Sequence, residues 1–222
     1  MNIGSNQWKK LIEEGAADLN VHVNRKITDQ FSIHSKELIK WNRKINLTAI
    51  TDPVEVAVKH FLDSIISVRV IPEYGRLLDI GSGGGFPGIP LKIMNPSLSV
   101  TLIDASRKKV SFLKHAIRSI KLVGINARHA RSEELAKGKP FKHSFDVIIS
   151  RAFSRLDKMI LQALPLLAEG GSMIAMKGKL SESELESADR DHLSLTVEKY
   201  KLPLVGLERS LVILKLKKLG DQ

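Results

Sequence analysis

Apolar residues follow two different patterns along the 222-residue chain, and the pattern changes near residue 75. Up to about residue 70 the spacing is helical. In residues 26–45 one helical face would gather Ile27, Phe31, Leu38, Trp41 and Ile45. A second helix is expected over residues 51–68, because Thr51 and Asp52 precede Pro53 at its first turn. The stretch PEYG at 72–75 ends this helical part.

From residue 76 on, short apolar runs alternate with helical stretches such as 107–122. The runs predict strands at 76–80, 99–104, 145–150 and 171–177, with a weaker one at 125–130. Such alternation indicates βαβ units and a mainly parallel sheet. The strand-like runs 195–203 and 209–218 predict an antiparallel hairpin at the end. We therefore expect an α/β fold in which a helical cap, residues 1–70, packs on a sheet domain, residues 71–222.

The composition removes several kinds of chemistry. The chain has no cysteine, which excludes disulfides, cysteine-ligated metals and a thiol nucleophile. His, Asp and Glu show no metal-ligand spacing, so we expect no metal. No signal-peptide core and no long uncharged apolar run occurs. We expect a cytoplasmic protein that acts as a monomer and does not bind a membrane.

The charge points to a polyanionic partner. The formal net charge is +11 and the sequence pI is about 9.8. The basic residues are clustered: residues 106–121 carry six Lys and Arg without one acid, and 137–143 and 177–179 add more. Clustered cations attract phosphates and release counterions, so nucleic acid is the expected partner rather than a merely solvated basic surface.

The stretch LLDIGSGGGFPGIPL, residues 77–91, places a glycine turn directly after a predicted strand. Glycine permits positive φ and lets a ligand approach the backbone. The spacing from Gly81 through Gly83 is G-x-G-x-G rather than a dinucleotide fingerprint. Asp79, inside the strand end, suits a cationic amine better than a pyrophosphate. S-adenosylmethionine, which carries a sulfonium and an amino group, fits these features.

An acid also closes the next predicted strand. Asp104 at this position can accept both ribose hydroxyls of an adenosine. The alternative is that Asp104 caps the helix that follows, but Ser106 can serve as that cap equally well. We favour the ribose for Asp104 and count Ser106 with the cofactor-binding residues.

The glycine stretch occurs together with LIDASRKKVSFL, FDVIISRAF, WNRKINLT and VKHFLDS. Jointly these segments resemble the bacterial 16S rRNA guanine-N7 methyltransferase family, also called glucose-inhibited division protein B. The resemblance runs from about Trp41 to Lys179. It implies a class I S-adenosylmethionine-dependent methyltransferase, with a Rossmann-like sheet, that acts on 16S rRNA or the small ribosomal subunit.

The resemblance also implies roles for single residues. Gly81 and Phe86 fall at the cofactor-contacting turn, and Ser132 and Glu133 match the pair beside the adenine. Arg151 matches a position beside the methyl-transfer site. Five further residues match positions that face RNA or a phosphate: Asn46, His60, Lys108, Arg131 and Lys177. For His60 the residues themselves leave a second interpretation, a packed and hydrogen-bonded histidine within a helix.

The acceptor atom follows from what the chain lacks. Methylation of pyrimidine C5 generally needs a thiol, and amine methylation commonly uses an Asp/Asn-Pro-Pro-aromatic run where this chain has SRAF, residues 150–153. Guanine N7 has a free lone pair and loses no proton, so alignment suffices. Arg151 would position the substrate, and Phe86 and Phe153 are candidates for stacking. Two alternatives remain: a methyltransferase with another acceptor, and an RNA-binding ribosome-assembly factor whose cofactor site is vestigial.

Overall fold

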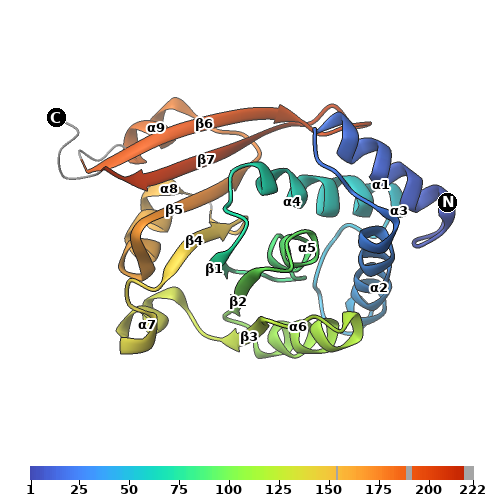
Figure 1. Ribbon diagram of the computed structural model, residues 1–222, viewed down its shortest axis with the longest axis horizontal. Coiled ribbons are helices and arrows are strands. Elements are labelled where there is room, and N and C mark those ends of the chain that lie inside the picture. The colour runs from blue at the N-terminus through green and yellow to red at the C-terminus, as the bar shows by residue number, and fades with distance from the viewer. Residues whose placement is uncertain (154, 189–191, 218–222) are drawn as a thin grey trace.

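The computed structural model describes residues 1–153, 155–188 and 192–217. Its centre is a seven-stranded sheet in the order β3-β2-β1-β4-β5-β7-β6 (Figure 1). The strands are β1 (Gly75–Ile80), β2 (Leu98–Asp104), β3 (Ile125–His129), β4 (Phe145–Ser150), β5 (Leu167–Lys177), β6 (Leu193–Lys201) and β7 (Glu208–Leu216). The strands β3, β2, β1, β4 and β5 pair in parallel, and β7 pairs antiparallel with both β5 and β6. This confirms the predicted parallel sheet and terminal hairpin.

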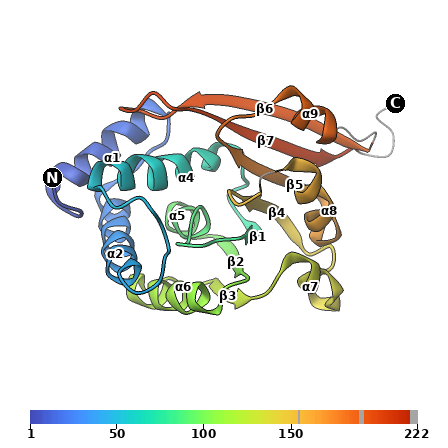
Figure 2. The same cartoon turned by 180° about the vertical axis from the view of Figure 1, so that it is seen from behind.

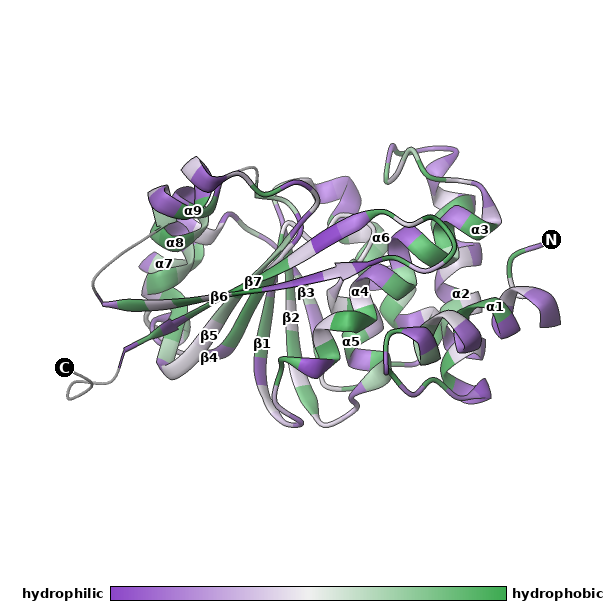
Figure 3. Cartoon of the chain, turned by 90° about the horizontal axis from the view of Figure 1, so that it is seen from above, coloured by the Kyte–Doolittle hydropathy of each residue, from purple (hydrophilic) through white to green (hydrophobic). Residues whose placement is uncertain are grey.

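Helices cover both faces of the sheet, which Figure 3 shows edge-on between two helical layers. They are α1 (Asn6–Asp18), α2 (Arg25–Asn42), α3 (Pro53–Glu55), α4 (Asp63–Ile65), α5 (Gly88–Met94), α6 (Arg107–Ile120), α7 (Ser132–Lys137), α8 (Leu156–Ala163) and α9 (Glu182–Ala188). Four short helical pieces are η1 (Val56–Leu62), η2 (Ile66–Arg69), η3 (Lys139–Phe141) and η4 (Leu164–Leu166). The helices α7, α8 and α9 lie on one face of the sheet, and the helices α1 to α6 lie on the opposite face.

The helix expected over 26–45 ends earlier, at Asn42. The Asn42 side chain ends it, because its Oδ1 accepts the N–H groups of Leu47 and Thr48 at 2.8 and 3.0 Å. The helix expected over 51–68 begins as predicted: Asp52 caps it by accepting the N–H groups of Val54 and Glu55. It is not uniformly α-helical, since η1 within it is a π-helix.

The N-terminal helices share an apolar core with the sheet. Trp8, Phe31 and Phe61 are fully buried in the same cluster as Leu77 of β1 and Val147 of β4. A second cluster fills the opposite face beneath α8. The helices up to residue 70 thus complete the core of one sheet face, and the division into two domains at residue 70 stays a prediction.

Candidate active site

The glycine turn follows the C-terminal end of β1 and contacts the segment that follows β4. Gly81 and Gly83 have φ of +74° and +53°, in the region that glycine adopts without strain. A Cβ on Gly81 would lie 2.6 Å from Cβ of Ala152, which follows Arg151. The Ser150 hydroxyl donates to the Ile80 carbonyl at 2.7 Å. The turn after β1 and the segment after β4 are therefore in direct contact.

Asp79 is fully buried below this turn. Its Oδ2 accepts the Gly88 N–H at 2.9 Å, and its Oδ1 has no hydrogen-bond partner among the described residues. Burial raises the pKa of Asp79 to about 7 against the lowering effect of the Gly88 bond. A buried carboxyl oxygen without a partner favours a cationic donor, as the sequence predicts for Asp79.

Asp104 closes β2 and is 8% exposed. Its Oδ2 accepts the Gly83 N–H at 3.0 Å and its Oδ1 accepts the Ser106 N–H at 2.8 Å. The helix cap itself is Ser106, whose hydroxyl lies 3.4 Å from the Lys109 N–H. Each carboxylate oxygen has a second lone pair, so Asp104 can hold the glycine turn and still accept a ribose hydroxyl.

Ser132 and Glu133 begin α7 after β3, and both form hydrogen bonds with Gln162 of α8. The Ser132 hydroxyl is buried and donates to Oε1 of Gln162 at 2.8 Å. Nε2 of Gln162 in turn donates to Oε1 of the exposed Glu133 at 2.6 Å. Ser132 therefore supports Glu133 from inside. Sequence reasoning missed Gln162, because it stands 29 residues from Glu133 along the chain.

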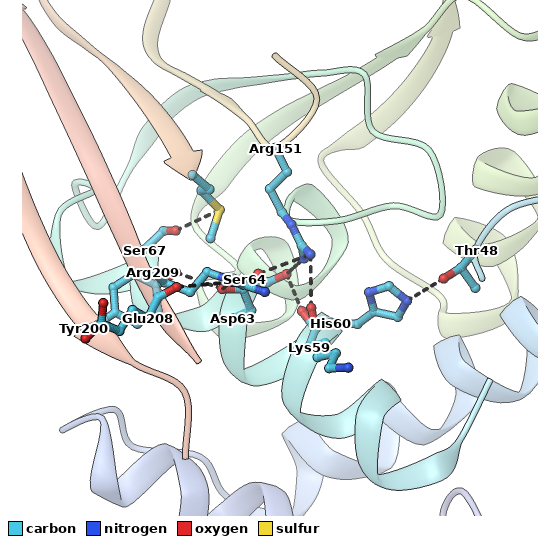
Figure 4. Close-up of polar contacts among 11 residues, drawn as sticks. Thr48, Lys59, His60, Asp63, Ser64, Ser67, Arg151, Tyr200, Glu208 and Arg209 are labelled. Carbon is cyan, nitrogen blue, oxygen red and sulfur yellow. Dashed lines mark hydrogen bonds and ion pairs between the residues drawn. The ribbon is translucent and has the colours of Figure 1, made fainter. Parts of the chain in front are cut away.

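Arg151 points away from the sheet toward the segment of α3 to α4 (Figure 4). Its Nη2 donates to the Lys59 carbonyl at 3.0 Å and lies 3.1 Å from Oδ2 of Asp63. Its Nη1 donates to the Ser64 hydroxyl at 3.3 Å. Arg151 also lowers the pKa of Asp79 through its charge, which places both groups in one electrostatic environment.

Phe86 lies between two histidines at the glycine turn. Its ring stacks on His60 with centroids 4.4 Å apart and on His34 at 4.8 Å. His60 is 7% exposed, and its Nε2 lies 2.9 Å from Oγ1 of Thr48. His60 is therefore packed and hydrogen-bonded within the helical segment, which was the alternative to RNA contact in the sequence analysis. Contact of His60 with RNA stays a prediction that requires the Thr48 bond to be exchanged.

His34 was not singled out from the sequence. Its Nε2 lies 2.8 Å from the Gly84 carbonyl, and it is fully buried. Desolvation lowers the pKa of His34 to about 4 and that of His60 to about 3. A signal was present, because His34 lies three residues after Phe31 and four before Leu38, on the apolar face of α2.

Lys177 does not lie on the surface. It is 8% exposed, its Nζ donates to the Phe153 carbonyl at 3.1 Å, and it pairs with Glu184 of α9 at 2.7 Å. Lys177 thus ties the segment after β4 to α9. Its predicted contact with a phosphate would require this ion pair to open.

The remaining candidates for RNA contact are exposed: Asn46, Lys108 and Arg131. Lys108 belongs to a group of exposed basic residues on α6 and at its C-terminal cap: Arg107, Lys108, Lys114, Arg118 and, at the cap, Lys121. Helix α2 crosses α6 through Trp41, which meets Phe112 and His115, and both helices are visible from behind in Figure 2. Helix α2 adds the exposed Lys36 and Lys40, and the exposed Arg43 and Lys44 follow just beyond its end.

The residues at this edge fit S-adenosylmethionine. Asp79 offers a buried oxygen without a partner, and Asp104 offers a carboxylate at the end of the neighbouring strand. A Cβ on Gly83 would meet only the Gly81 carbonyl, at 3.9 Å, so the backbone there is open to a ligand. Within the described residues no group of His, Asp and Glu could hold a metal ion, and no described helix is long and apolar enough to cross a membrane.

Comparison with known proteins identifies the family. The family model of rRNA small subunit methyltransferase G matches residues 27–212. A relative from Geobacter sp. (strain M21), named ribosomal RNA small subunit methyltransferase G, is 44% identical over 212 residues, covering 93% of this chain and 96% of the relative. A relative of the same name from Desulfitobacterium hafniense is 38% identical over 189 residues, covering 85% of this chain and 79% of its own.

Solved structures share the fold at low identity. TYW2 from M. jannaschii in complex with AdoMet superposes with a TM-score of 0.52 at 17% identity, over 67% of this chain and 72% of that chain. These comparisons confirm the class I methyltransferase fold, the enzyme class and the use of S-adenosylmethionine. The chain belongs to the rRNA small subunit methyltransferase G family.

Proposed function

We propose that the protein transfers a methyl group from S-adenosylmethionine to N7 of a guanine in 16S rRNA of the small ribosomal subunit. The observation that carries the proposal is the arrangement at one sheet edge. A carboxylate pair suited to the cofactor, Asp79 and Asp104, lies at the ends of the neighbouring strands β1 and β2, and Arg151 follows β4 on the other side of β1. The exposed basic residues of α2 and α6 lie on helices that contact the same glycine turn or follow Asp104.

Each part of the cofactor would contact different residues of the site. Asp79 would hold the amino group through its free oxygen, and Asp104 would accept ribose hydroxyls beside Ser106. Gly81 and Gly83 would leave room for the ligand, with Phe86 held behind them by His60 and His34. Glu133, supported by Ser132, would face the adenine. Bound at this edge, S-adenosylmethionine supplies an electrophilic methyl group.

The chain's own residues then need only position the acceptor. Guanine N7 attacks with its lone pair, the N7–methyl bond forms as the sulfur–methyl bond breaks, and no proton has to leave. Arg151 keeps N–H donors that can bind guanine O6, which would leave N7 free to face the methyl group. Holding reactants in line supplies a large part of such a rate.

A groove at the same edge extends the surface offered to RNA. It has a volume of about 1100 Å³ and runs between the end of β5 and the β6–β7 hairpin. Its lining includes three exposed lysines: Lys179, Lys199 and Lys201. With Lys108 and Arg131 on the other side of Arg151 in strand order, these cations support binding of a polyanion across the site.

The decisive experiment uses 16S rRNA from cells that lack the gene. The purified protein with S-adenosylmethionine should create one new N7-methylguanine, mapped by cleavage at that base. Offering free rRNA and the assembled subunit in parallel decides between these substrates. If the protein binds S-adenosylmethionine but transfers no methyl group to RNA, a methyltransferase with another acceptor is favoured. If it binds no S-adenosylmethionine at all, the RNA-binding ribosome-assembly factor is favoured. The cytoplasmic location and the monomer belong to this proposal, and sedimentation of the purified protein tests the latter.

A further inference from the structure

A buried carboxylate, Asp63, lies where three parts of the chain meet. It begins α4 and is 3% exposed. Its Oδ2 faces Arg151, its Oδ1 accepts the Tyr200 O–H from β6 at 2.8 Å, and Arg209 Nε of β7 lies 3.6 Å from Oδ1. Figure 4 shows these side chains converging on Asp63 from the segment after β4 and from the hairpin. Of these groups only Arg151 belongs to the proposed active site.

Among the described residues, the partners of the Arg151 guanidinium all lie on one side of it, in the helical segment. A guanidinium has five N–H donors. Three of them are used on the helical segment, toward the Lys59 carbonyl, Asp63 and Ser64. The contacts among the described residues leave two donors for another partner, and the Arg151 side chain is 24% exposed. The bound side fixes the guanidinium, and the other side can reach a substrate.

The winding of the helix places these three groups together. Asp63 and Ser64 follow Lys59 by four and five residues. Lys59 belongs to η1, a π-helix, in which backbone hydrogen bonds link residues i and i+5. All three groups therefore meet the same guanidinium. This gives the VKHFLDS segment a physical role: His60 supports Phe86, and the residues around it hold Arg151.

The hairpin keeps Asp63 in place independently of Arg151. Burial, reinforced by the Asp63 charge, raises the pKa of Tyr200, so Tyr200 remains a neutral O–H donor. Arg209 supplies a second positive charge, and with one carboxylate and two guanidiniums the group carries a net charge of +1. Asp63 thus stays compensated when Arg151 turns its free donors toward a substrate.

This part of the fold also has contacts that do not depend on the Asp63 charge. The hairpin is already joined to β5 by continuous backbone pairing from Ser172–Lys215 to Lys177–Ser210, and the helix is anchored by the fully buried Leu62 and Ile65. Burying ionic groups generally stabilises a protein no more than apolar residues of similar size would. The position of Arg151 is what the Asp63 carboxylate determines.

We propose that Asp63, anchored by Tyr200 and Arg209, is a positioning residue for methyl transfer: it sets the place of the Arg151 guanidinium beside the acceptor guanine. This inference rests on the proposed function, because Arg151 positions the acceptor there. It assigns Asp63 no contact with the reacting atoms.

The test compares Asp63→Asn with a matched control, Asp146→Asn. Asp146 is also an aspartate paired with an arginine, Arg76, but at the opposite edge of the sheet. Asp63→Asn should slow single-turnover transfer to saturating 16S rRNA by about 100-fold, the size expected of a misplaced group. Its dissociation constant for S-adenosylmethionine should stay within about threefold, and Asp63→Glu should restore part of the rate. Asp146→Asn should transfer at the wild-type rate.

A second readout needs no RNA. In ¹⁵N NMR of the arginine side chains, Asp63→Asn should shift and broaden the Arg151 signal, which Arg151→Lys identifies. If Asp63→Asn does not fold, Tyr200→Phe keeps the charge and should still lower the rate and move this signal. A wild-type rate in Asp63→Asn or Tyr200→Phe, or an unchanged Arg151 signal, overturns the positioning role. A wild-type protein that methylates no 16S rRNA overturns the proposed function, and this inference with it.

Discussion

The N–H of Gly88 donates to Oδ2 of the buried Asp79 across 2.9 Å, which ties the first turn of α5 to the end of β1. Gly88 is required for this contact, since a Cβ there would lie 2.3 Å from Cδ2 of Leu102 and 2.7 Å from Asp79 Oδ2. The other oxygen of Asp79 remains without a partner among the described residues. The chain therefore carries a carboxyl group that is costly to ionise until a cation reaches it.

This arrangement predicts that cofactor binding releases a proton. The pKa of Asp79 is raised to about 7, so much of the free protein carries a protonated Asp79 at pH 6.5. A cationic amino group favours the carboxylate, and affinity for S-adenosylmethionine should therefore rise about fivefold from pH 6 to pH 7. Calorimetry at pH 6.5 in two buffers of different ionisation enthalpy measures the proton. Asp79→Asn should bind with no such release; equal release by both proteins would show that another group titrates.

Asp104→Ala should weaken S-adenosylmethionine binding, because each charge-assisted bond to a ribose hydroxyl is worth about 1.5–3 kcal/mol. Asp104 also holds the N–H groups of Gly83 and Ser106, so some loss of stability is expected as well. Asp52→Ala is the matched control, since Asp52 likewise accepts two backbone N–H groups. It should lose about 0.5–2 kcal/mol of stability with unchanged cofactor affinity. Asp104→Ala with wild-type affinity in calorimetry would refute the ribose contact.

The two histidines beside Phe86 predict loss of stability in acid. Their folded pKa values, about 4 for His34 and about 3 for His60, lie below 6.5. The unfolded chain therefore binds more protons below pH 6.5, and each histidine costs up to about 1.4 kcal/mol per pH unit as pH falls. Asp79 acts with the opposite sign: its raised pKa gives stability in acid that is lost as pH rises through 7.

His34→Gln removes one of these protonation sites. Between pH 6.5 and pH 4.5 the free energy of unfolding should therefore fall less steeply with pH, by up to about 1.4 kcal/mol per pH unit. Urea unfolding at several pH values gives the slope. The exposed His22 provides the control, and His22→Gln should follow the wild type. An identical slope in His34→Gln would mean that His34 is already protonated in the folded protein.

The alternation of apolar runs was sufficient to predict the parallel sheet, the hairpin and the edge where the site lies, because these depend on local periodicity. The partners of site residues were not predictable in this way. Arg151 meets Asp63 across 88 positions, and Tyr200 meets the same Asp63 across 137. Lys177 illustrates the limit: it belongs to a basic stretch in the sequence but is paired with Glu184, which only the placement of α9 against the end of β5 reveals.

That difference separates two lysines that the sequence treats alike. Lys108→Ala should flatten the dependence of log K for RNA on log salt by about 0.7–0.9 units, the contribution of one phosphate contact. Lys10→Ala, an exposed lysine on α1, should not change the slope. Lys177→Ala should instead lower the unfolding temperature, since the largely buried Glu184 loses its ion pair with Lys177. An unchanged slope in Lys108→Ala would make Lys108 part of a solvated surface only.

The acceptor atom can be tested on the substrate itself. Among the residues after β4, neither Arg151 nor the apolar pair Ala152 and Phe153 can act as a general base, and the chain has no cysteine. Substrate RNA with 7-deazaguanine at the target keeps its base pairing but has carbon in place of N7. It should bind with normal affinity, because phosphates dominate binding, and accept no methyl group.

On normal RNA the single-turnover rate should also show no dependence on a general base between about pH 6.5 and 8.5. Single-turnover conditions prevent slow product release from imitating that result. Methyl transfer to the deaza substrate at the normal rate would exclude N7 and make an exocyclic amine or a ring carbon the acceptor.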